Sequence, residues 1–362
     1  MSVLTCIILV FSVLGALDWI FSSKFGLGKE FERGFRILGD MALSMIGMII
    51  ISPFLADVMR PFFSFVNNVI HVDPSIIPAS LFANDMGGAP LAVEVATNEK
   101  VGMFNALVVS AMMGATISFT VPVSLGMVKK ENHRELLLGL LCGIVTIPVG
   151  CFVSGLVCGL GMIELIINLL PLVLFSAIVA IGLIKCPTLC VKVFGAVAFL
   201  IKVLITIGLV LGIIRFLSGY EVIKGLETIE NASLVCLNAS VVMTGAFPFM
   251  FVVSKLLSKP LGVVSRKTGI NETSAVGFIS SLATNLTTLG MMNDMDKRGV
   301  LMNAAFAVSA SFTFAGHLAF TMAFNENYIF PMIIGKLVAG VSALVLSYLL
   351  FCRKNKVNFE RK

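Results

Sequence analysis

Long apolar runs alternate with short polar segments along almost the entire chain. A lipid-spanning helix needs about 20 mostly apolar residues. Nine runs meet this length and predict spanning helices near 3–21, 38–59, 104–127, 136–159, 162–184, 193–215, 232–256, 300–323 and 329–352. Two further runs, 76–97 and 270–292, are long enough but are interrupted by Gly, Pro, Ser, Thr and Asn. We therefore expect two broken helices among nine continuous ones.

Composition assigns these runs to a membrane rather than to a soluble core. Apolar residues make up 58% of the chain and charged residues only 13%, with a mean hydropathy of +1.02. A soluble protein is nearer half apolar and a quarter charged. The sequence therefore predicts an all-α polytopic membrane protein with one domain over 1–362. The net charge of +6 then reports orientation in the bilayer, and we expect no nucleic-acid partner.

The positions of Lys and Arg distinguish two topologies. If both broken segments cross the membrane, giving eleven spans, the two sides carry 14 and 10 basic residues. If both are re-entrant hairpins, the two sides carry 20 and 4. Cytoplasmic loops collect Lys and Arg, so nine spans and two re-entrant hairpins are favoured over the alternative of 10–11 full spans. This arrangement predicts an external N-terminus and a cytoplasmic C-terminus.

A repeat relates the two broken segments. The sequence "NEKVGMFNALVVSA" (98–111) matches "MDKRGVLMNAAFAVSA" (295–310), and the separation is close to 200 residues. Each copy contains a span, a broken hairpin and another span, over about 38–127 and 232–323, with connecting spans at about 136–215. With nine spans, the first copy would begin by crossing the membrane outward and the second by crossing inward, so the two copies would be inverted. Inverted repeats with broken segments near the bilayer midplane are typical of secondary transporters.

The first broken segment, "SLFANDMGGAPLAVEVATNEK" (80–100), supplies most of the candidate binding residues. Asp85 lies where the hairpin should turn, and Gly87 and Gly88 let the backbone approach a ligand. A carboxylate at membrane depth costs a few kcal/mol, which indicates a function. The alternative is a carboxylate that caps a half-helix or pairs with a buried cation. We place Asn84, Asp85, Gly87, Gly88 and Glu94 in the predicted substrate site.

The second broken segment offers neutral hydrogen-bonding groups, Thr284 and Asn285, at the equivalent place. One charged and one neutral hairpin suit a solute with a charged end and a hydroxyl end. His317 lies inside the run 300–323 and is a candidate for ligand binding or proton relay, the alternative being a core histidine. Lys336, in the last run, would either neutralise a site carboxylate or extend to the membrane interface.

Asn105 and Asn303 occupy equivalent places in the repeat and have supporting roles, either on the ligand or in fixing the hairpins. The eight cysteines lie in or beside apolar runs without His in a metal-binding pattern. We therefore expect no metal and no cofactor.

A string of motifs resembles one family over most of the chain. "GDMALSMIGM", "NDMGGAPLA", "GIVTIPVGC", "MDKRG", "GHLAF" and "IFPMIIGKL" occur in the order found in the ethanolamine permeases of bacterial ethanolamine-utilisation operons. The sequence departs from that family at Thr287, where Pro is common, and at Gly316, where an acidic residue is common. The resemblance implies a multi-pass protein of the bacterial inner membrane that admits ethanolamine, by facilitated or ion-coupled transport.

Ethanolamine also suits the candidate residues. Its amine should have a pKa near that of lysine, ~10, so well under about 1% is neutral at pH 7. The cation needs a carboxylate in place of its water, which Asp85 could supply, and the hydroxyl needs a partner such as Asn285. The alternatives are a carrier of another small metabolite such as an organic anion, and an intramembrane enzyme. The sequence does not determine the oligomeric state and leaves a homo-oligomer open.

Overall fold

The computed structural model describes the backbone of residues 3–352 and the side chains of that range except those at 70, 191 and 257–268. Within 3–352 the chain consists of helices and connecting turns, with no strand. The all-α class predicted from the apolar pattern is therefore confirmed. The predicted cytoplasmic end of the chain, 353–362, lies outside the described residues.

The α-helices are α1 (Val3–Ile20), α2 (Leu27–Arg36), α3 (Leu38–Phe65), α4 (Ile76–Leu81), α5 (Gly88–Val95), α6 (Glu99–Phe104), α7 (Val121–Met127), α8 (His133–Val157), α9 (Met162–Lys185), α10 (Pro187–Ser218), α11 (Ile229–Thr268), α12 (Glu272–Ala283), α13 (Asn285–Met291), α14 (Lys297–Ala310), α15 (Gly316–Phe324) and α16 (Ile329–Ser347). The π-helical segments are η1 (Val66–Ile70), η3 (Asn105–Gly114), η4 (Thr116–Thr120) and η8 (Tyr348–Cys352). Short 3-10 turns are η2 (Asn84–Met86), η5 (Lys130–Asn132), η6 (Met292–Asp294) and η7 (Glu326–Tyr328).

Eight helical stretches of the described chain are long and apolar enough to cross a membrane. They are Val3–Ile20, Leu27–Val69, Glu99–Met127, Lys130–Val157, Met162–Lys185, Pro187–Ser218, Ile229–Leu256 and Glu326–Cys352. Each coincides with one of the nine predicted spans. The chain is therefore a multi-pass membrane protein by the length and composition of its helices.

The one predicted span that does not coincide with these stretches, 300–323, is not a continuous helix. It is divided into α14 and α15 by residues 311–315, where Phe312 has a φ of 61°. The backbone N–H groups of Phe312 and Phe314 donate to the carbonyls of Ser281 and Leu282, both at 3.0 Å. These bonds to α12 replace helical ones within 300–323. Hydropathy could not reveal the break, because the segment stays apolar throughout.

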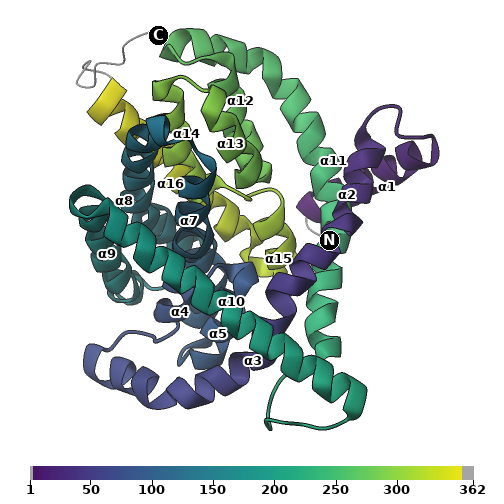
Figure 1. The fold of residues 1–362 in the computed structure, drawn as a ribbon, viewed down its shortest axis with the longest axis vertical. Helices are drawn as coiled ribbons and strands as arrows, with labels where there is room; N and C mark the ends of the chain where they lie inside the picture. Colours follow the sequence, from purple (N-terminus) through teal and green to yellow (C-terminus); the bar gives the residue numbers. More distant parts are fainter. Residues whose placement is uncertain (1–2, 353–362) are drawn as a thin grey trace.

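The helices pack as two groups joined by α3 and α10 (Figure 1). In one group α8, α14 and α16 pack against one another, and α9 packs on α8. In the other, α1 and α2 pack on the long helix α11. Between the groups, α10 packs along α3 and crosses the front of the view. Hairpin segments pack against both groups: α4 contacts α9 in the first, and α12 contacts α11 in the second as well as α14 in the first.

Both broken segments form helical hairpins. Hairpin 1 is α4 packed on α5, and hairpin 2 is α12 packed on α13. They lie toward opposite ends of the molecule, hairpin 1 toward the bottom and hairpin 2 toward the top of Figure 1. In each case one long helix precedes the hairpin and contacts it: α3 contacts α5, and α11 contacts α12. The predicted breaks at 76–97 and 270–292 are therefore confirmed as breaks.

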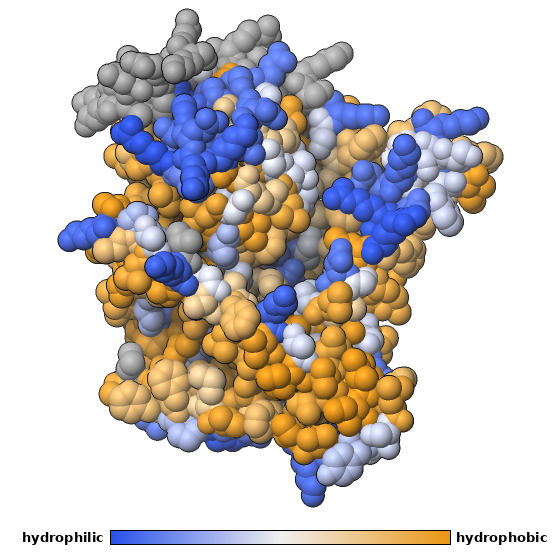
Figure 2. All heavy atoms as spheres, viewed as in Figure 1, coloured by the Kyte–Doolittle hydropathy of each residue, from blue (hydrophilic) through white to orange (hydrophobic). Residues whose placement is uncertain are grey.

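The outer surface is largely apolar. Figure 2 shows hydrophobic residues over much of the visible flank, with hydrophilic residues gathered toward the upper end. Large apolar side chains on this surface are well exposed, including Leu217 at 77%, Ile163 at 76% and Phe199 at 68%. Soluble monomers rarely expose apolar patches of this extent. The lipid bilayer is the environment that suits such a surface.

Candidate functional site

Hairpin 1 is broken between α4 and α5. Two extended residues and the turn η2 separate the helices, and Gly87 then has a φ of 100°. That left-handed conformation favours glycine, and a Cβ at this position would also collide with the Met48 side chain. The helix begins again at Gly88. Asp85 consequently lies in a turn between two short helices, as the sequence predicts.

The side chains of this turn have few protein partners. Asn84 is fully buried, and neither its Nδ2 nor its Oδ1 has a hydrogen-bond partner among the described residues. Asp85 is partly exposed and forms no ion pair within the described part of the chain. A buried polar group without a partner costs roughly 1–3 kcal/mol. Both side chains are thus available to a polar ligand.

The span that follows hairpin 1 is irregular where it packs on this break. It contains the π-helical segments η3 and η4. The Ser118 hydroxyl accepts from the backbone N–H of Ala83 at 3.2 Å, and Gly114 lies so close to the hairpin backbone that a Cβ would collide with it. The Thr116 hydroxyl donates to the carbonyl of Val308 in α14 at 3.2 Å. The irregular span therefore connects hairpin 1 to the divided helix α14–α15.

Hairpin 2 is broken at Thr284, whose backbone is extended. The next residue, Asn285, is fully buried, and its Nδ2 donates to the Thr120 hydroxyl of η4 at 3.2 Å. Its Oδ1 has no partner among the described residues. The opposite side of the break pairs through its backbone with residues 311–315. Hydrogen bonds therefore link four interruptions of regular α-helix, two in hairpins and two in spans, to one another.

A buried lysine and histidine lie beside these linked interruptions. The Lys336 side chain is 1% exposed, and its Nζ donates to the carbonyl of Ala111 at 2.7 Å and lies 3.0 Å from His317 Nδ1. The His317 ring packs on Phe312, with 5.2 Å between ring centroids. The turn η2 contacts α15, and Asp85 interacts electrostatically with Lys336. The structure therefore brings Asp85, His317 and Lys336 into one neighbourhood.

Each hairpin has its two ends joined by an aspartate. Asp73, before hairpin 1, accepts from the backbone N–H groups of Thr97 and Asn98 after it, at 3.0 and 2.9 Å. Asp296, after hairpin 2, accepts from the backbone N–H of Asn271 before it, at 2.8 Å. The two ends of each hairpin therefore lie side by side, and its break lies about midway between them in sequence.

The two repeated asparagines hold the starts of the hairpins. Asn105 donates to the Ser75 hydroxyl at 2.8 Å and exchanges hydrogen bonds with Asn168 at 3.1 and 2.9 Å. Asn303 donates to the carbonyl of Ser274 at 2.8 Å. In this structure both contact hairpin residues rather than the breaks, which agrees with the structural alternative considered from the sequence.

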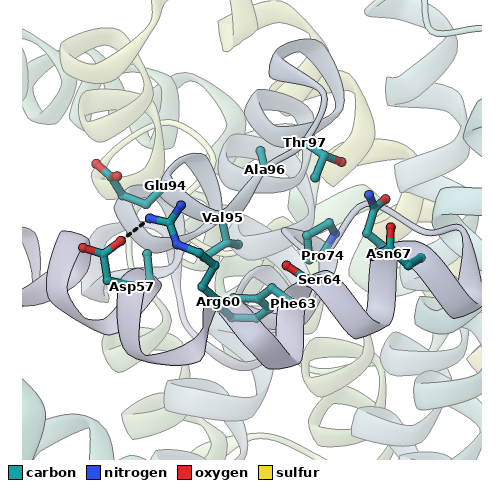
Figure 3. Close-up of a pocket in the computed structure, with 12 residues that line it drawn as sticks. Asp57, Arg60, Phe63, Ser64, Asn67, Pro74, Glu94, Val95, Ala96 and Thr97 are labelled. Atoms are coloured by element: carbon teal, nitrogen blue, oxygen red, sulfur yellow. Dashed lines mark hydrogen bonds and ion pairs between the residues drawn. The ribbon is translucent and has the colours of Figure 1, made fainter.

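Glu94 lies away from Asp85, at the other end of α5. It lines a pocket of about 310 Å³ beside the Asp57–Arg60 ion pair (Figure 3). Its side chain is exposed, and it interacts electrostatically with Asp57 and Glu227. The structure therefore does not bring Asp85 and Glu94 into one site, and Glu94 belongs to a separate opening between α3 and hairpin 1.

Thr284 lines an opening on the other side of the molecule. With Thr287 and Ser280 it faces Glu30 and Arg33 of α2 across a pocket of about 320 Å³. The pocket lies between hairpin 2 and the group formed by α2 and α11. Thr284 therefore lies both at the break of hairpin 2 and in the wall of this opening.

Several polar residues near the breaks were missed from the sequence. Ser118 and Thr120 contact the two hairpin breaks, while Ser309 and Thr321 are buried with hydroxyls that have no partner among the described residues. The stretch "ATISFT" (115–120) carries a signal, since three hydroxyl residues occur within five positions of an apolar span. No such signal marks Ser309 or Thr321.

Comparison with known proteins assigns the chain to a family. The sequence matches the family described as "Ethanolamine utilisation protein, EutH" over residues 1–350. It is 40% identical over 352 residues to the probable ethanolamine permease EutH of Listeria monocytogenes, which covers 97% of this chain and 94% of that protein. It is 35% identical over 382 residues to the probable ethanolamine permease EutH of Salmonella typhimurium, covering 95% of this chain and 94% of the relative. No solved structure matches it. The chain therefore belongs to the EutH family of ethanolamine utilisation proteins.

Proposed function

We propose that this protein is a permease that carries ethanolamine, as its ammonium cation, across the bacterial inner membrane. The observation that carries the proposal is Asp85, a carboxylate in the break of hairpin 1 with no ion-pair partner among the described residues. The names of the relatives, probable ethanolamine permeases, support the same substrate and favour transport over an intramembrane enzyme.

The two ends of ethanolamine have complementary groups at the breaks. Asp85 replaces the water around the ammonium group with a charge-assisted hydrogen bond. The partnerless amide atoms of Asn84 and Asn285 are suited to the hydroxyl, and the Thr321 hydroxyl adds a third such group. Gly87 and Gly88 allow the close packing that holds this turn, since a Cβ at either position would collide with Met48 or with the Phe82 carbonyl, while Thr284 contacts the solute on its way to the site. Asn105 and Asn303 act indirectly by holding the hairpins.

The topology we propose has two re-entrant hairpins that approach the midplane from opposite faces. The joined ends at Asp73 and Asp296 support it, because a segment that crossed the bilayer would separate its ends. The opposite placement of the hairpins in Figure 1 and the distribution of Lys and Arg also support it. The copies 38–127 and 232–323 are then inverted repeats around the site, with the N-terminus outside and the C-terminus in the cytoplasm.

A carrier for an organic anion is the second candidate, favoured by one observation. Lys336 and His317 are basic residues beside the breaks. Lys336 is nevertheless buried, and it donates to the Ala111 carbonyl and lies within hydrogen-bond distance of His317. The more accessible charge is that of Asp85, which is partly exposed. We therefore favour the cation.

Uptake of radiolabelled ethanolamine into proteoliposomes tests the proposal. Saturable uptake above that of protein-free liposomes, reduced by excess unlabelled ethanolamine but not by a dicarboxylate, is the expected result. Imposed proton and sodium gradients then separate facilitated diffusion from ion coupling. Saturable uptake of the dicarboxylate instead would establish the anion carrier, and the absence of both would refute a transport function for this site.

A further inference from the structure

Lys336 presents an electrostatic problem once an ammonium solute is bound at Asp85. Its amino group is buried against η3 and α15, and the carboxylate whose charge acts on it is Asp85, in the turn η2 that contacts α15. A bound ethanolammonium would place a second cation beside the same carboxylate. At an effective dielectric constant of about 20, two such charges several ångströms apart repel by roughly 3 kcal/mol. The two cations therefore compete for Asp85.

The hydrogen bonds of Lys336 show how the competition can be resolved. A protonated amino group has three hydrogens to donate, whereas two atoms that can accept lie within hydrogen-bond distance among the described residues: the Ala111 carbonyl at 2.7 Å and, in the tautomer with its hydrogen on Nε2, His317 Nδ1 at 3.0 Å. Loss of one proton leaves an NH₂ group whose two hydrogens still serve both acceptors. The neutral form of Lys336 therefore keeps its packing and its hydrogen bonds.

Few titratable groups other than Lys336 itself lie where they could exchange a proton when the solute binds. Within the described part of the chain, the titratable residues whose charges act on the Lys336 amino group are Asp85 in hairpin 1, Cys151 in α8 and His317 in α15. On α14, Phe306 and Ala310 pack against the same helix. His317 accepts through Nδ1 when Lys336 donates, so its ring is neutral with the hydrogen on Nε2. Lys336 is consequently the cation that can yield its charge.

We propose that Lys336 is a proton-exchange residue of this carrier: ethanolammonium binds at Asp85 as Lys336 releases one proton to solvent, and departure of the solute allows Lys336 to take a proton back. This inference rests on the proposed function. One cation arrives and one proton leaves, so the charge of the site is the same with and without solute. Transport is then an electroneutral exchange of ethanolammonium for a proton.

Calorimetry of ethanolamine binding to the purified protein tests the exchange. Titrations near pH 7 in two buffers of different ionisation enthalpy count the protons released per solute bound. About one proton is expected for the unaltered protein and close to none for Lys336→Met, which should still bind. Lys336→Arg cannot lose its proton, so its affinity should fall on the order of 100-fold. Lys202→Met, which alters an exposed lysine in another span, should still release about one proton.

The protonation state of the bound solute shows whether the released proton comes from the protein, and this can be measured even if the Lys336 variants do not fold. The ¹⁵N chemical shift of labelled ethanolamine bound to the unaltered protein should be that of an ammonium group, which assigns the released proton to the protein. Release of a proton with a neutral bound amine would overturn the inference. Saturable binding without proton release would also overturn it and leave the proposed function intact, whereas the absence of both binding and uptake would refute the proposed function itself.

Transport in proteoliposomes gives a second readout. A potassium diffusion potential, negative inside, should not raise ethanolamine uptake by the unaltered protein, because the exchange moves no net charge. It should raise uptake by Lys336→Met, in which the cation moves alone, by up to about tenfold per 59 mV at equilibrium. Stimulation of the unaltered protein by the potential to the same extent as the variant would contradict the exchange.

Discussion

Replacing Asp85 with asparagine tests the site most directly. The change keeps the shape of the side chain and its capacity to accept a hydrogen bond, and it removes the charge. Because no cation forms an ion pair with Asp85 among the described residues, the substitution breaks no direct ion pair within the protein. Asp85 is also partly exposed in its turn, so the amide can be accommodated.

The magnitude follows from the contact that is lost. A hydrogen bond to a charged group contributes about 1.5–3 kcal/mol, and 1.4 kcal/mol corresponds to roughly tenfold in affinity. Affinity for ethanolamine should therefore fall by roughly 10- to 150-fold in Asp85→Asn. Asn285→Ala removes a neutral hydrogen bond of about 1 kcal/mol and should cost only about fivefold.

The assay is the concentration dependence of labelled ethanolamine uptake, normalised to the amount of protein in the membrane. Glu94→Gln is the matched control, because it removes a carboxylate from the opposite end of α5. We expect less than about threefold change for it, since an exposed charge is screened. Unchanged affinity in Asp85→Asn would make that carboxylate a structural group. A large loss in Glu94→Gln instead would move the site to the pocket of Figure 3.

Three further predictions concern topology, physiology and pH. A cysteine at Asn98 should react with an impermeant thiol reagent from outside the cell and a cysteine at Asn293 only from the cytoplasm, in a protein lacking the native cysteines; cytoplasmic labelling at Asn98 would support eleven spans. Cells without the protein should grow worse on limiting ethanolamine at acidic than at alkaline external pH, because acid depletes the neutral amine; equal defects would argue against a carrier of the cation. In the loop before α11, hydrogen bonds from the Thr228 backbone and the Asn231 amide hold the pKa of Glu227 below its ordinary value. Their stabilising effect is therefore present above that ordinary value and lost as pH falls through the lowered pKa, so the melting temperatures of the unaltered protein and Glu227→Gln should converge in acid; a difference that stays constant with pH would refute this account.

Much of the fold was predictable because lipid imposes a simple rule on sequence. A spanning helix must satisfy its own backbone within an apolar stretch of about 20 residues, so eight of the nine predicted spans coincide with long helices. The break of hairpin 1 was also visible, since Gly87 supplies a left-handed φ and Pro90, which lacks a backbone N–H, fits in the first turn of the helix that begins just after that glycine. The inverted repeat and the re-entrant course of the hairpins remain predictions.

The break at 311–315 marks the limit of that rule. Its residues are apolar or carry small hydroxyls, as in an ordinary span, and the left-handed residue is a phenylalanine. The helix opens there because Phe312 and Phe314 donate to carbonyls in hairpin 2. The partner that decides the conformation lies about 30 residues earlier in the chain, and no window of sequence contains the reason.

From the sequence alone, the composition and the apolar runs determined that the chain is a helical membrane protein, and its local breakers determined where two helices stop. Only the tertiary structure decided which polar residues meet. Asp85 and Glu94 are nine positions apart, yet Asp85 lies in the turn before α5 and Glu94 near the far end of that helix, whereas Lys336 donates to Ala111, 225 positions away. Helix breaks depend on neighbouring residues, whereas a binding site depends on the packing of whole helices, which brings together residues that are distant along the chain.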